Sequence, residues 1–438
     1  MIFEKDQKFV INKIKHYQNS NCKKNSSFNS EYFSSVSNNF CFALMQFWLG
    51  KKRFLTLLKY FFFELYFCLN INNYNLIAKN INFFKFKKII LTWGNEKNLS
   101  NNNFYDKFLN INSSKNKNIL WIVIYSGDKS KIKFLNNVIY VTEVKISFYK
   151  KIFNFLSWIL CSILKKKINK KNLLTFFSWH NFFSFKIINI IKLVIKKNIR
   201  FFFIIYEAQP FQTETIYFIK KNFSNIRCIG YVHSFPPFAS HMLKKDYSPD
   251  QIILNSYDQQ STFCKYLGWN NKEIKLMPSA RFRINANQDM VNKIYLPINF
   301  FSSNNILFNF RKIIDYLQKY NLKNFIIQNH PECLQSRKHI RLIYDMNLIL
   351  SKLNNGKKIL KNTSIFIGAT GSVIEALLYG LDVYHIVEDP LFEAYSPNFW
   401  PSIKLTFLND RIIKYKVKNF GFMKFGKSDY LVTKYLNV

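Results

Sequence analysis

Acidic residues and glycine are both scarce in this chain of 438 residues. It has 25 Asp and Glu against 64 Lys and Arg, which gives a formal charge of +39, and only 11 glycines. An excess of positive charge this large attracts phosphate groups, whether they belong to nucleotides, nucleic acids or lipid headgroups. Hydrophobic residues make up 48% of the chain. That share is enough for real cores and excludes global disorder.

Several motifs that would define a function class are missing. The seven cysteines include no CxxC pair, so the sequence predicts a reduced chain with neither a disulfide framework nor a zinc site. No Asp-x-Asp occurs, so a metal-held sugar diphosphate is not indicated, and we expect no metal and no cofactor. The N-terminal residues 1–20 lack the apolar core of a signal peptide.

Long uncharged apolar runs are missing as well, so we expect no transmembrane span. Two aromatic-rich stretches come closest, at 54–69 and 152–164. Lys59 and Glu64 interrupt the first, and lysines flank the second on both sides. Basic residues around an aromatic helix are typical of a membrane-surface element, but a buried core helix with solvated ends would show the same pattern. The sequence leaves both interpretations open.

Short apolar β-type runs alternate with helical stretches, which predicts largely parallel, doubly wound sheets. The predicted strands are 88–93, 119–125, 137–141, 200–206, 226–232, 250–254 and 273–277 in the first half, then 306–310, 324–328, 364–368, 383–387 and 403–408. Helices are predicted between several of them, including 213–222, 256–266, 311–320 and 335–354. A change of composition at 283–305 indicates a linker.

We therefore expect an α/β protein with two Rossmann-like lobes. An N-terminal lobe would cover 86–285 and a C-terminal lobe 296–410. An irregular, helical extension would precede them over 1–85, and a tail would follow over 411–438.

Three of the scarce glycines, Gly368, Gly371 and Gly380, fall within thirteen positions. The residues before Gly368 predict a buried strand, and the apolar spacing after Ser372 predicts a helix that ends at Gly380. The turn between strand and helix offers free backbone N–H groups and the hydroxyls of Thr370 and Ser372. Such a turn favours an anion at the helix N-terminus. The simpler alternative is that one of these hydroxyls only caps the helix.

Two further stretches place polar residues at predicted strand ends, where doubly wound sheets bind ligands. His330 and Pro331 follow the predicted strand 324–328, and the proline restricts the histidine backbone. In the first lobe Glu207 directly follows the strand 200–206 and His233 follows the next one, so we expect the two side chains to face one cleft. A carboxylate there can act as a general base. Each of these residues could instead be an ordinary loop residue or a structural hydrogen bonder.

One match to a phosphate-binding motif does not indicate a phosphate-binding loop. Residues 421–428, GFMKFGKS, fit the phosphate-loop pattern. That loop needs a strand before it and a helix after it, and only the ten residues from 429 to 438 follow.

The Asn-His-Pro loop and the Gly/Ser/Thr turn before an EALLYG helix resemble those of GT-B glycosyltransferases. The likeness is strongest to bacterial surface-polysaccharide enzymes of the sialyltransferase and Kdo-transferase types, which use CMP-activated acidic sugars. The segment YEAQPFQTE, with IRCIGYVHS after it, also resembles the first lobe of uncharacterised surface-carbohydrate biosynthesis proteins. The resemblance covers roughly residues 200–390, and the span between His330 and Thr370 is shorter than the family's.

The resemblance implies roles for the candidate residues. His330 and Pro331 would form the His-Pro pair on the nucleotide phosphate, and the turn with Gly368, Thr370, Gly371 and Ser372 would hold the same phosphate. Glu375 would touch the ribose. Glu207 would be the carboxylate on the acceptor side, with His233 as its alternative.

The sequence therefore predicts a metal-independent transferase that moves a sugar from a nucleotide-sugar donor to a glycan or lipid-linked acceptor. Basic residues and aromatic helices would hold it peripherally at the anionic inner face of the plasma membrane. A basic nucleic-acid-binding protein is the alternative from another class, but the lysines are spread throughout rather than gathered on one stretch. A catalytically inactive GT-B-like protein that binds a partner is the third.

Overall fold

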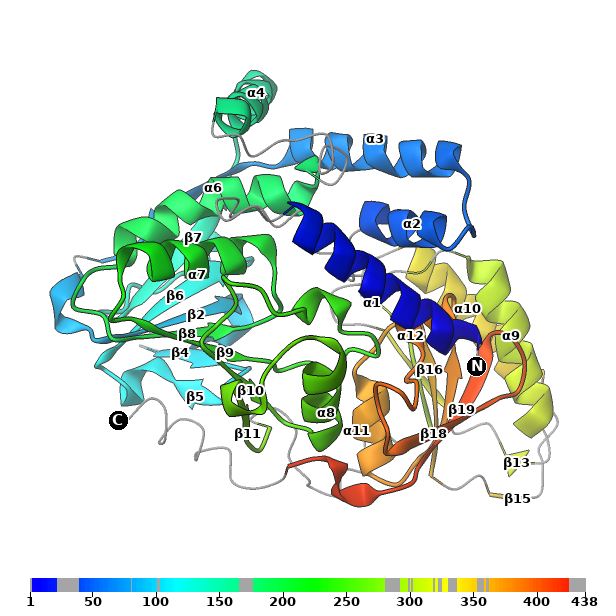
Figure 1. The fold of residues 1–438 in the computed structure, drawn as a ribbon. Helices are drawn as coiled ribbons and strands as arrows, with labels where there is room; N and C mark the ends of the chain where they lie inside the picture. The colour runs from blue at the N-terminus through cyan, green and yellow to red at the C-terminus, as the bar shows by residue number, and fades with distance from the viewer. Residues whose placement is uncertain are drawn as a thin grey trace.

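The computed structural model shows two α/β lobes with N-terminal helices lying across them (Figure 1). It describes residues 2–21, 39–79, 81–100, 103–164, 176–279, 292–297, 300, 302–317, 320–321, 325–329, 337–352, 358–359 and 362–424. None of the helices in these ranges is long and apolar enough to cross a membrane.

In the described chain, the first lobe contains a sheet of eight strands in the order β1-β7-β6-β2-β8-β9-β10-β11. Its strands are β1 (Asn73–Ile77), β2 (Lys88–Gly94), β6 (Ile119–Tyr125), β7 (Val138–Val144), β8 (Phe201–Ile205), β9 (Arg227–Tyr231), β10 (Gln251–Leu254) and β11 (Ile274–Leu276). Neighbours are parallel except β1 and β7. Counted from β2, the parallel strands follow the doubly wound order 3-2-1-4-5-6 with β11 added at the edge. The order reverses between β2 and β8.

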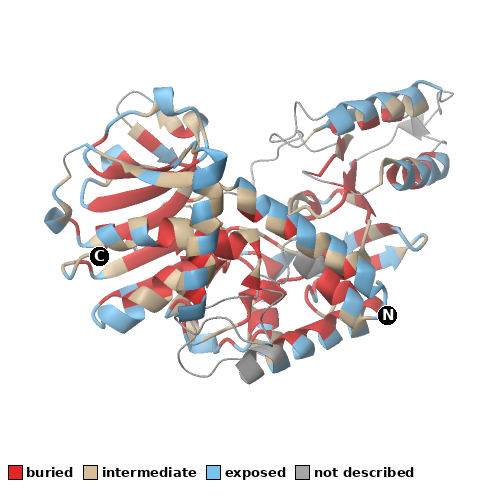
Figure 2. Cartoon of the chain, turned by 90° about the horizontal axis from the view of Figure 1, so that it is seen from above, coloured by how far each residue is buried: buried red, intermediate tan, exposed pale blue. Residues whose placement is uncertain are grey.

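Both faces of this sheet are covered. The helices α6 (Trp179–Val194) and α7 (Pro210–Asn222) cover one face, and a small sheet of β3 (Leu99–Ser100), β4 (Asn103–Asp106) and β5 (Ile111–Asn112) covers the other. Every residue of β6 is buried, because its alternate side chains enter the two different cores. Leu120 packs with the helices and Trp121 with the small sheet. Figure 2 shows this concentration of buried residues in the strands.

Within the described residues, the second lobe contains a sheet of six strands in the order β14-β12-β16-β17-β19-β18. They are β12 (Lys293–Tyr295), β14 (Ile326–Gln328), β16 (Thr363–Ile367), β17 (Asp382–Ile386), β18 (Ile403–Phe407) and β19 (Ile412–Val417). Strands β14, β12, β16 and β17 run parallel to one another. Strand β19 is antiparallel to both of its neighbours, β17 and β18. Their order in this parallel part is 2-1-3-4, so the reversal lies between β12 and β16.

Helices cover both faces of the second sheet as well. The core on one side contains α9 (Ser303–Leu317) and α10 (Arg337–Ser351), and the core on the other contains α11 (Ser372–Leu378) and α12 (Pro390–Glu393). Two short strands, β13 (Tyr320–Asn321) and β15 (Lys358–Ile359), pair with each other apart from the main sheet.

The two lobes are joined by direct contacts. In the first lobe, α8 (Tyr257–Tyr266) carries Asp258, whose carboxylate accepts bonds from the backbone N–H and the hydroxyl of Ser402. Thr262 of the same helix donates to the carbonyl of Phe399. One contiguous cluster of buried apolar residues includes strand residues of both sheets. The lobes therefore share a packed core at this contact.

The N-terminal helices bridge the lobes. They are α1 (Ile2–Asn21), α2 (Asn39–Trp48) and α3 (Phe54–Asn70). Gln7 of α1 donates to the carbonyl of Leu391 in the second lobe, and Phe3 packs edge-on against Phe407. A further helix, α4 (Phe148–Leu164), stands above α6 in Figure 1.

The prediction of an α/β protein with mainly parallel sheets is confirmed, but several element predictions are wrong. Residues 306–310 belong to α9, not to a strand, because Ile306, Phe310 and Ile313 are buried at helical spacing. The region 283–305, interpreted as a linker, contains β12 and the start of α9.

The expected lobe boundaries also need correction. Residues 412–417 were expected in a tail, but they form β19 within the second sheet. Successive buried side chains of this strand enter the cores on its two faces. The described part of 1–85 is helical, as expected, with three helices, but it is not a separate extension, because β1 within it extends the first sheet.

Candidate functional site

Glu207 lies in a tight turn between β8 and α7, at the point where the strand order of the first sheet reverses. The buried side chain of Gln212 holds this turn. Its amide donates to the carbonyl of Ile205 at 2.7 Å, and its oxygen accepts the backbone N–H groups of Glu207 at 2.9 Å and of Gln209 at 3.2 Å. Ala208 adopts a left-handed conformation with φ of 52°. The turn is therefore fixed by one side chain that reaches back from the helix.

The sequence around Glu207 explains why the chain turns here. Gln209 is the N-cap residue of α7, Pro210 occupies its first turn, and Gln212 completes a capping box. Proline suits that position because its missing N–H would have no partner in a first helical turn. The Tyr-Glu-x-Gln-Pro segment is thus a strand end, a strained turn and a helix start in succession.

The structure brings Glu207 and His233 together. His233 follows β9, the neighbour of β8, and its Nε2 lies 3.5 Å from Oε1 of Glu207. The amide of Gln209 donates to the other carboxylate oxygen at 2.8 Å. The Glu207 side chain is 27% exposed, whereas that of His233 is only 6% exposed. Only the carboxylate of this pair is therefore open to a ligand, and the imidazole lies beneath it.

An aromatic wall orients the imidazole. Phe108 meets the His233 ring edge-on with centroids 4.5 Å apart, and Trp93 at the end of β2 contacts Phe108 in turn. The buried carboxylate of Asp106 accepts the backbone N–H groups of Phe108 and Leu109. Burial raises the pKa of Asp106 to about 6, although the bonds from these N–H groups act in the opposite direction.

The glycine-rich turn of the second lobe follows β16 and lies at that sheet's own order reversal. Gly368 has φ of +66°, and a Cβ there would lie 3.1 Å from Pro297, which follows β12. The Gly368 carbonyl lies 2.7 Å from Nε2 of the buried His385. Thr370, Gly371 and Ser372 are half-buried. The turn is therefore wedged between two strand ends while its outer residues stay partly open.

One of the two hydroxyls bonds within the turn, although the N-cap residue is Gly371 and no side chain caps the helix. The backbone N–H of Ser372 donates to the Thr370 hydroxyl at 3.3 Å. The helix that follows, α11, has only seven residues. Its C-terminus is closed by bonds from the Gly380 N–H to Leu377 and from the Leu381 N–H to Ala376, with Gly380 at φ of +73°. This is a Schellman ending, which agrees with the prediction that the helix stops at Gly380.

The loops that follow β9 and β16 meet. The hydroxyl of Tyr395 lies 2.8 Å from the carbonyl oxygens of both Phe235 and Thr370. A Cβ on Gly371 would lie 3.7 Å from the backbone nitrogen of Phe235. Phe235 stands two positions after His233. The carboxyl edges of the two sheets are therefore joined at the loops that carry the candidate residues.

The remaining candidates are placed less closely or fall outside the described residues. Glu375 is half-buried in α11, one turn before Tyr379, whose pKa is raised by burial and then by the Glu375 charge. His330 and Pro331 lie outside the described residues; β14, which precedes them, is parallel to β12 and hence to β16. No cluster able to hold a metal ion occurs in the described ranges.

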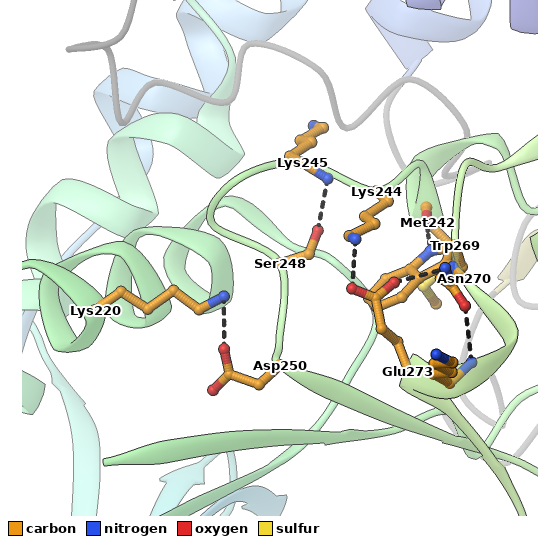
Figure 3. Close-up of polar contacts among 10 residues, drawn as sticks. Lys220, Met242, Lys244, Lys245, Ser248, Asp250, Trp269, Asn270 and Glu273 are labelled. Atoms are coloured by element: carbon orange, nitrogen blue, oxygen red, sulfur yellow. Dashed lines mark hydrogen bonds and ion pairs between the residues drawn. The ribbon is translucent and has the colours of Figure 1, made fainter. Parts of the chain in front are cut away.

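A hollow elsewhere in the first lobe, lined by lysines and carboxylates alike, has a different character. It has a volume of about 530 Å³ and lies where the chain enters β10 and β11, at the opposite edge of the sheet from Glu207. Figure 3 shows Lys220 directed at Asp250 and Lys244 at Glu273. These lysines are neutralised by carboxylates of the same loops, so we assign no ligand to the hollow.

Sequence reasoning missed the residues that support the Glu207–His233 pair. The spacing of Gln209, Pro210 and Gln212 is a capping signal that could have been found. Phe108 and Asp106 could not, because their approach to His233 depends on how the small sheet folds over the large one.

The chain matches no model of a known protein family and no curated protein.

Proposed function

We propose that this chain is a glycosyltransferase that moves a sugar from a nucleotide-sugar donor, of the CMP-activated acidic type, to a glycan or lipid-linked acceptor. The observation that carries the proposal is the position of the Glu207–His233 pair. Doubly wound sheets bind ligands at the carboxyl edge where the strand order reverses. Glu207 follows a strand at that point in the first sheet, and the Gly368–Ser372 turn follows one in the second.

The proposed reaction is a direct displacement at the anomeric carbon. An acceptor hydroxyl oxygen attacks the carbon and forms the new glycosidic bond. The bond from that carbon to the donor phosphate breaks, and the phosphate leaves with the electron pair. The hydroxyl proton passes to the partly exposed carboxylate of Glu207. His233, being buried, would act through Glu207 by orienting the carboxylate.

The second lobe would bind the leaving phosphate. Thr370, Ser372 and the backbone of their turn offer hydrogen bonds to it, and the resemblance adds His330 and Pro331 to this group. Donors fixed in advance around a developing negative charge lower the barrier without a metal. We also propose that the enzyme works peripherally at the inner face of the plasma membrane, where a lipid-linked acceptor would be available.

The test has a binding step and a transfer step. Thermal unfolding of the full chain is followed with CMP, UMP, UDP, GDP and ADP, and CMP is expected to stabilise it. A nucleotide at 100 times its dissociation constant adds about 2.7 kcal/mol to the free energy of unfolding. Release of CMP from CMP-activated acidic sugars is then measured with and without acceptor glycans.

The variant Glu207→Gln keeps the shape of the side chain and removes its basicity. It should retain nucleotide stabilisation and lose transfer, because a lost transition-state contact lowers the rate without weakening donor binding. Glu214→Gln is the matched control, since Glu214 lies on the same helix but bonds to Ser184 of α6. Full activity of Glu207→Gln would overturn the proposed role. A chain that no nucleotide stabilises, but that binds RNA with steep salt dependence, would instead support the nucleic-acid alternative.

A further inference from the structure

The helix α4 turns an apolar face to solvent. On its inner side Trp158 is fully buried and stacks on Phe176 with ring centroids 4.4 Å apart. Roughly opposite Trp158, at alternating spacings of four and three residues, lie large side chains that are 55 to 83% exposed: Tyr149, Phe153, Leu156, Leu160 and Ile163. This spacing keeps them on one side of the helix. A stripe that would normally enter a core therefore lies on the outside.

The neighbouring helix α3 has the same organisation. It buries Leu57, Glu64 and Cys68 on one side. Away from that side it exposes Leu55, Phe62, Phe63 and Tyr66, and Phe54 and Phe67 are exposed on its flanks. The ammonium group of Lys151 on α4 donates to the carbonyl of Asn70 at the end of α3, and Figure 1 shows both helices on the same side of the molecule. Together they form one apolar surface, here called the α3–α4 face.

The exposed charged side chains on α3 and α4 are all basic. Arg53, Lys59 and Lys150 are exposed at its margins. The one carboxylate within the two helices belongs to Glu64, which is buried and accepts the backbone N–H of Trp179. A second copy of this chain would bring like charges together across such an interface, and the net charge of +39 adds to that repulsion. An anionic surface would be complementary.

We propose that the α3–α4 face docks on the surface of a bilayer that contains anionic phospholipid. Its aromatic and aliphatic side chains would enter the boundary between headgroups and acyl chains, and its basic residues would contact the headgroup phosphates. The helices would lie on the membrane and not cross it. This inference rests on the exposed residues of α3 and α4 and holds whether or not the chain transfers sugars.

Vesicle sedimentation with the full chain tests the docking surface. The vesicles are phosphatidylcholine alone, or phosphatidylcholine mixed with phosphatidylglycerol. The chain should sediment with the mixed vesicles and bind the neutral ones more weakly. The triple variant Phe153→Ser, Leu156→Ser, Leu160→Ser should lower the partition coefficient at least ten-fold. Because these side chains are exposed, its melting temperature should match that of the wild type.

A matched control removes as much exposed apolar surface elsewhere. The triple variant Phe308→Ser, Tyr344→Ser, Phe420→Ser changes side chains that are 58, 63 and 59% exposed in the second lobe and near its end. It should bind vesicles like the wild type. Equal loss of binding in both triple variants would overturn the proposal, because binding would then follow total hydrophobicity.

Two other results would also overturn the proposal. One is absence of binding to the mixed vesicles. The other is a concentration-dependent dimer, seen by sedimentation equilibrium, that the α4 variant converts to a monomer without any change in vesicle binding. Nucleotide stabilisation is measured on the same variants and should be unchanged. If no nucleotide binds while vesicle docking persists, the transferase proposal fails and the docking surface stands.

Discussion

Glu393 should make the stability of this protein fall as the pH rises through neutrality. It ends α12 and is only 3% exposed. Burial raises the pKa of its carboxyl group to about 8, with further increases from the charges of Glu388 and Asp389. The backbone N–H of Glu388 donates to it at 2.7 Å, and this bond works in the opposite direction. The folded protein therefore holds a proton on Glu393 at neutral pH.

The sign and size of the effect follow from proton linkage. Below the unfolded pKa of 4.5 both states are protonated, so Glu393 adds no pH dependence. Between this value and about 8 the unfolded chain releases the proton while the folded chain keeps it, so stability decreases with pH. At about 1.36 kcal/mol per pKa unit, the loss by about pH 7 has an upper limit of about 3 kcal/mol.

The substitution Glu393→Gln removes this titration and keeps the shape of the side chain. Urea unfolding of wild type and variant is compared at about pH 5 and about pH 7, and the variant should gain stability relative to the wild type at the higher pH. Glu273→Gln is the control of opposite sign. Burial acts to raise the pKa of Glu273, but the bonds from Lys244 and the Asn270 N–H outweigh it and hold the pKa low (Figure 3).

The control variant should therefore lose stability relative to the wild type above the Glu273 pKa and regain it in acid. If the difference between wild type and Glu393→Gln is the same at both pH values, the proton on Glu393 does not exist in the folded state. The reasoning from burial would then be refuted.

Two further substitutions test how the loops at the candidate site are held. Tyr395→Phe removes the hydroxyl between the carbonyls of Phe235 and Thr370. It should lower the free energy of unfolding in urea by about 1–3 kcal/mol, because buried carbonyls lose their donor. An unchanged midpoint would show that the loops are held by packing alone. Gly368→Ala should destabilise more than Gly380→Ala, since both need a left-handed backbone at a cost of about 1–2 kcal/mol but only the first would crowd a neighbour. Equal thermal midpoints for the two alanine variants would contradict the close approach to Pro297.

The parts of the fold that sequence reasoning predicted are those with strong local patterns. The run at 119–125 has seven consecutive apolar or aromatic residues and forms β6 without any shift of boundary. Gly380 ended its predicted helix, because a glycine after a short apolar period is a local signal.

The failures arose where the deciding contacts are distant in sequence. Strand β12 has only three residues. Its place between β14 and β16 is set by pairing with strands that are distant in the sequence. At 306–310 the apolar residues were interpreted as a strand, although Ile306, Phe310 and Ile313 are spaced as in a helix.

The candidate site was predictable only in part. Glu207 and His233 each follow a strand, which the sequence indicates. That their strands are neighbours, and that β8 lies at the reversal of strand order, follows from sheet order, which no local pattern encodes. The hydrophobic stretches at 54–69 and 152–164 were ambiguous for the same reason. Amphipathic spacing defines two sides of a helix, and only the fold determines which side faces out.

Because glycine is scarce in this chain, the positions of Gly230 and Gly368 are informative. In a chain with 11 glycines, a glycine is informative where the structure requires one. A Cβ on Gly230 in β9 would lie 3.0 Å from the Cβ of Tyr206 and 2.9 Å from Pro249. Tyr206, the residue before Glu207, can therefore pack this close to β9 only because residue 230 has no side chain. Gly368 is required by both its backbone angle and Pro297. Both glycines keep strand ends close beside the loops that meet through Tyr395. The backbone constraints of the two sheets therefore converge where the loops of the two lobes meet.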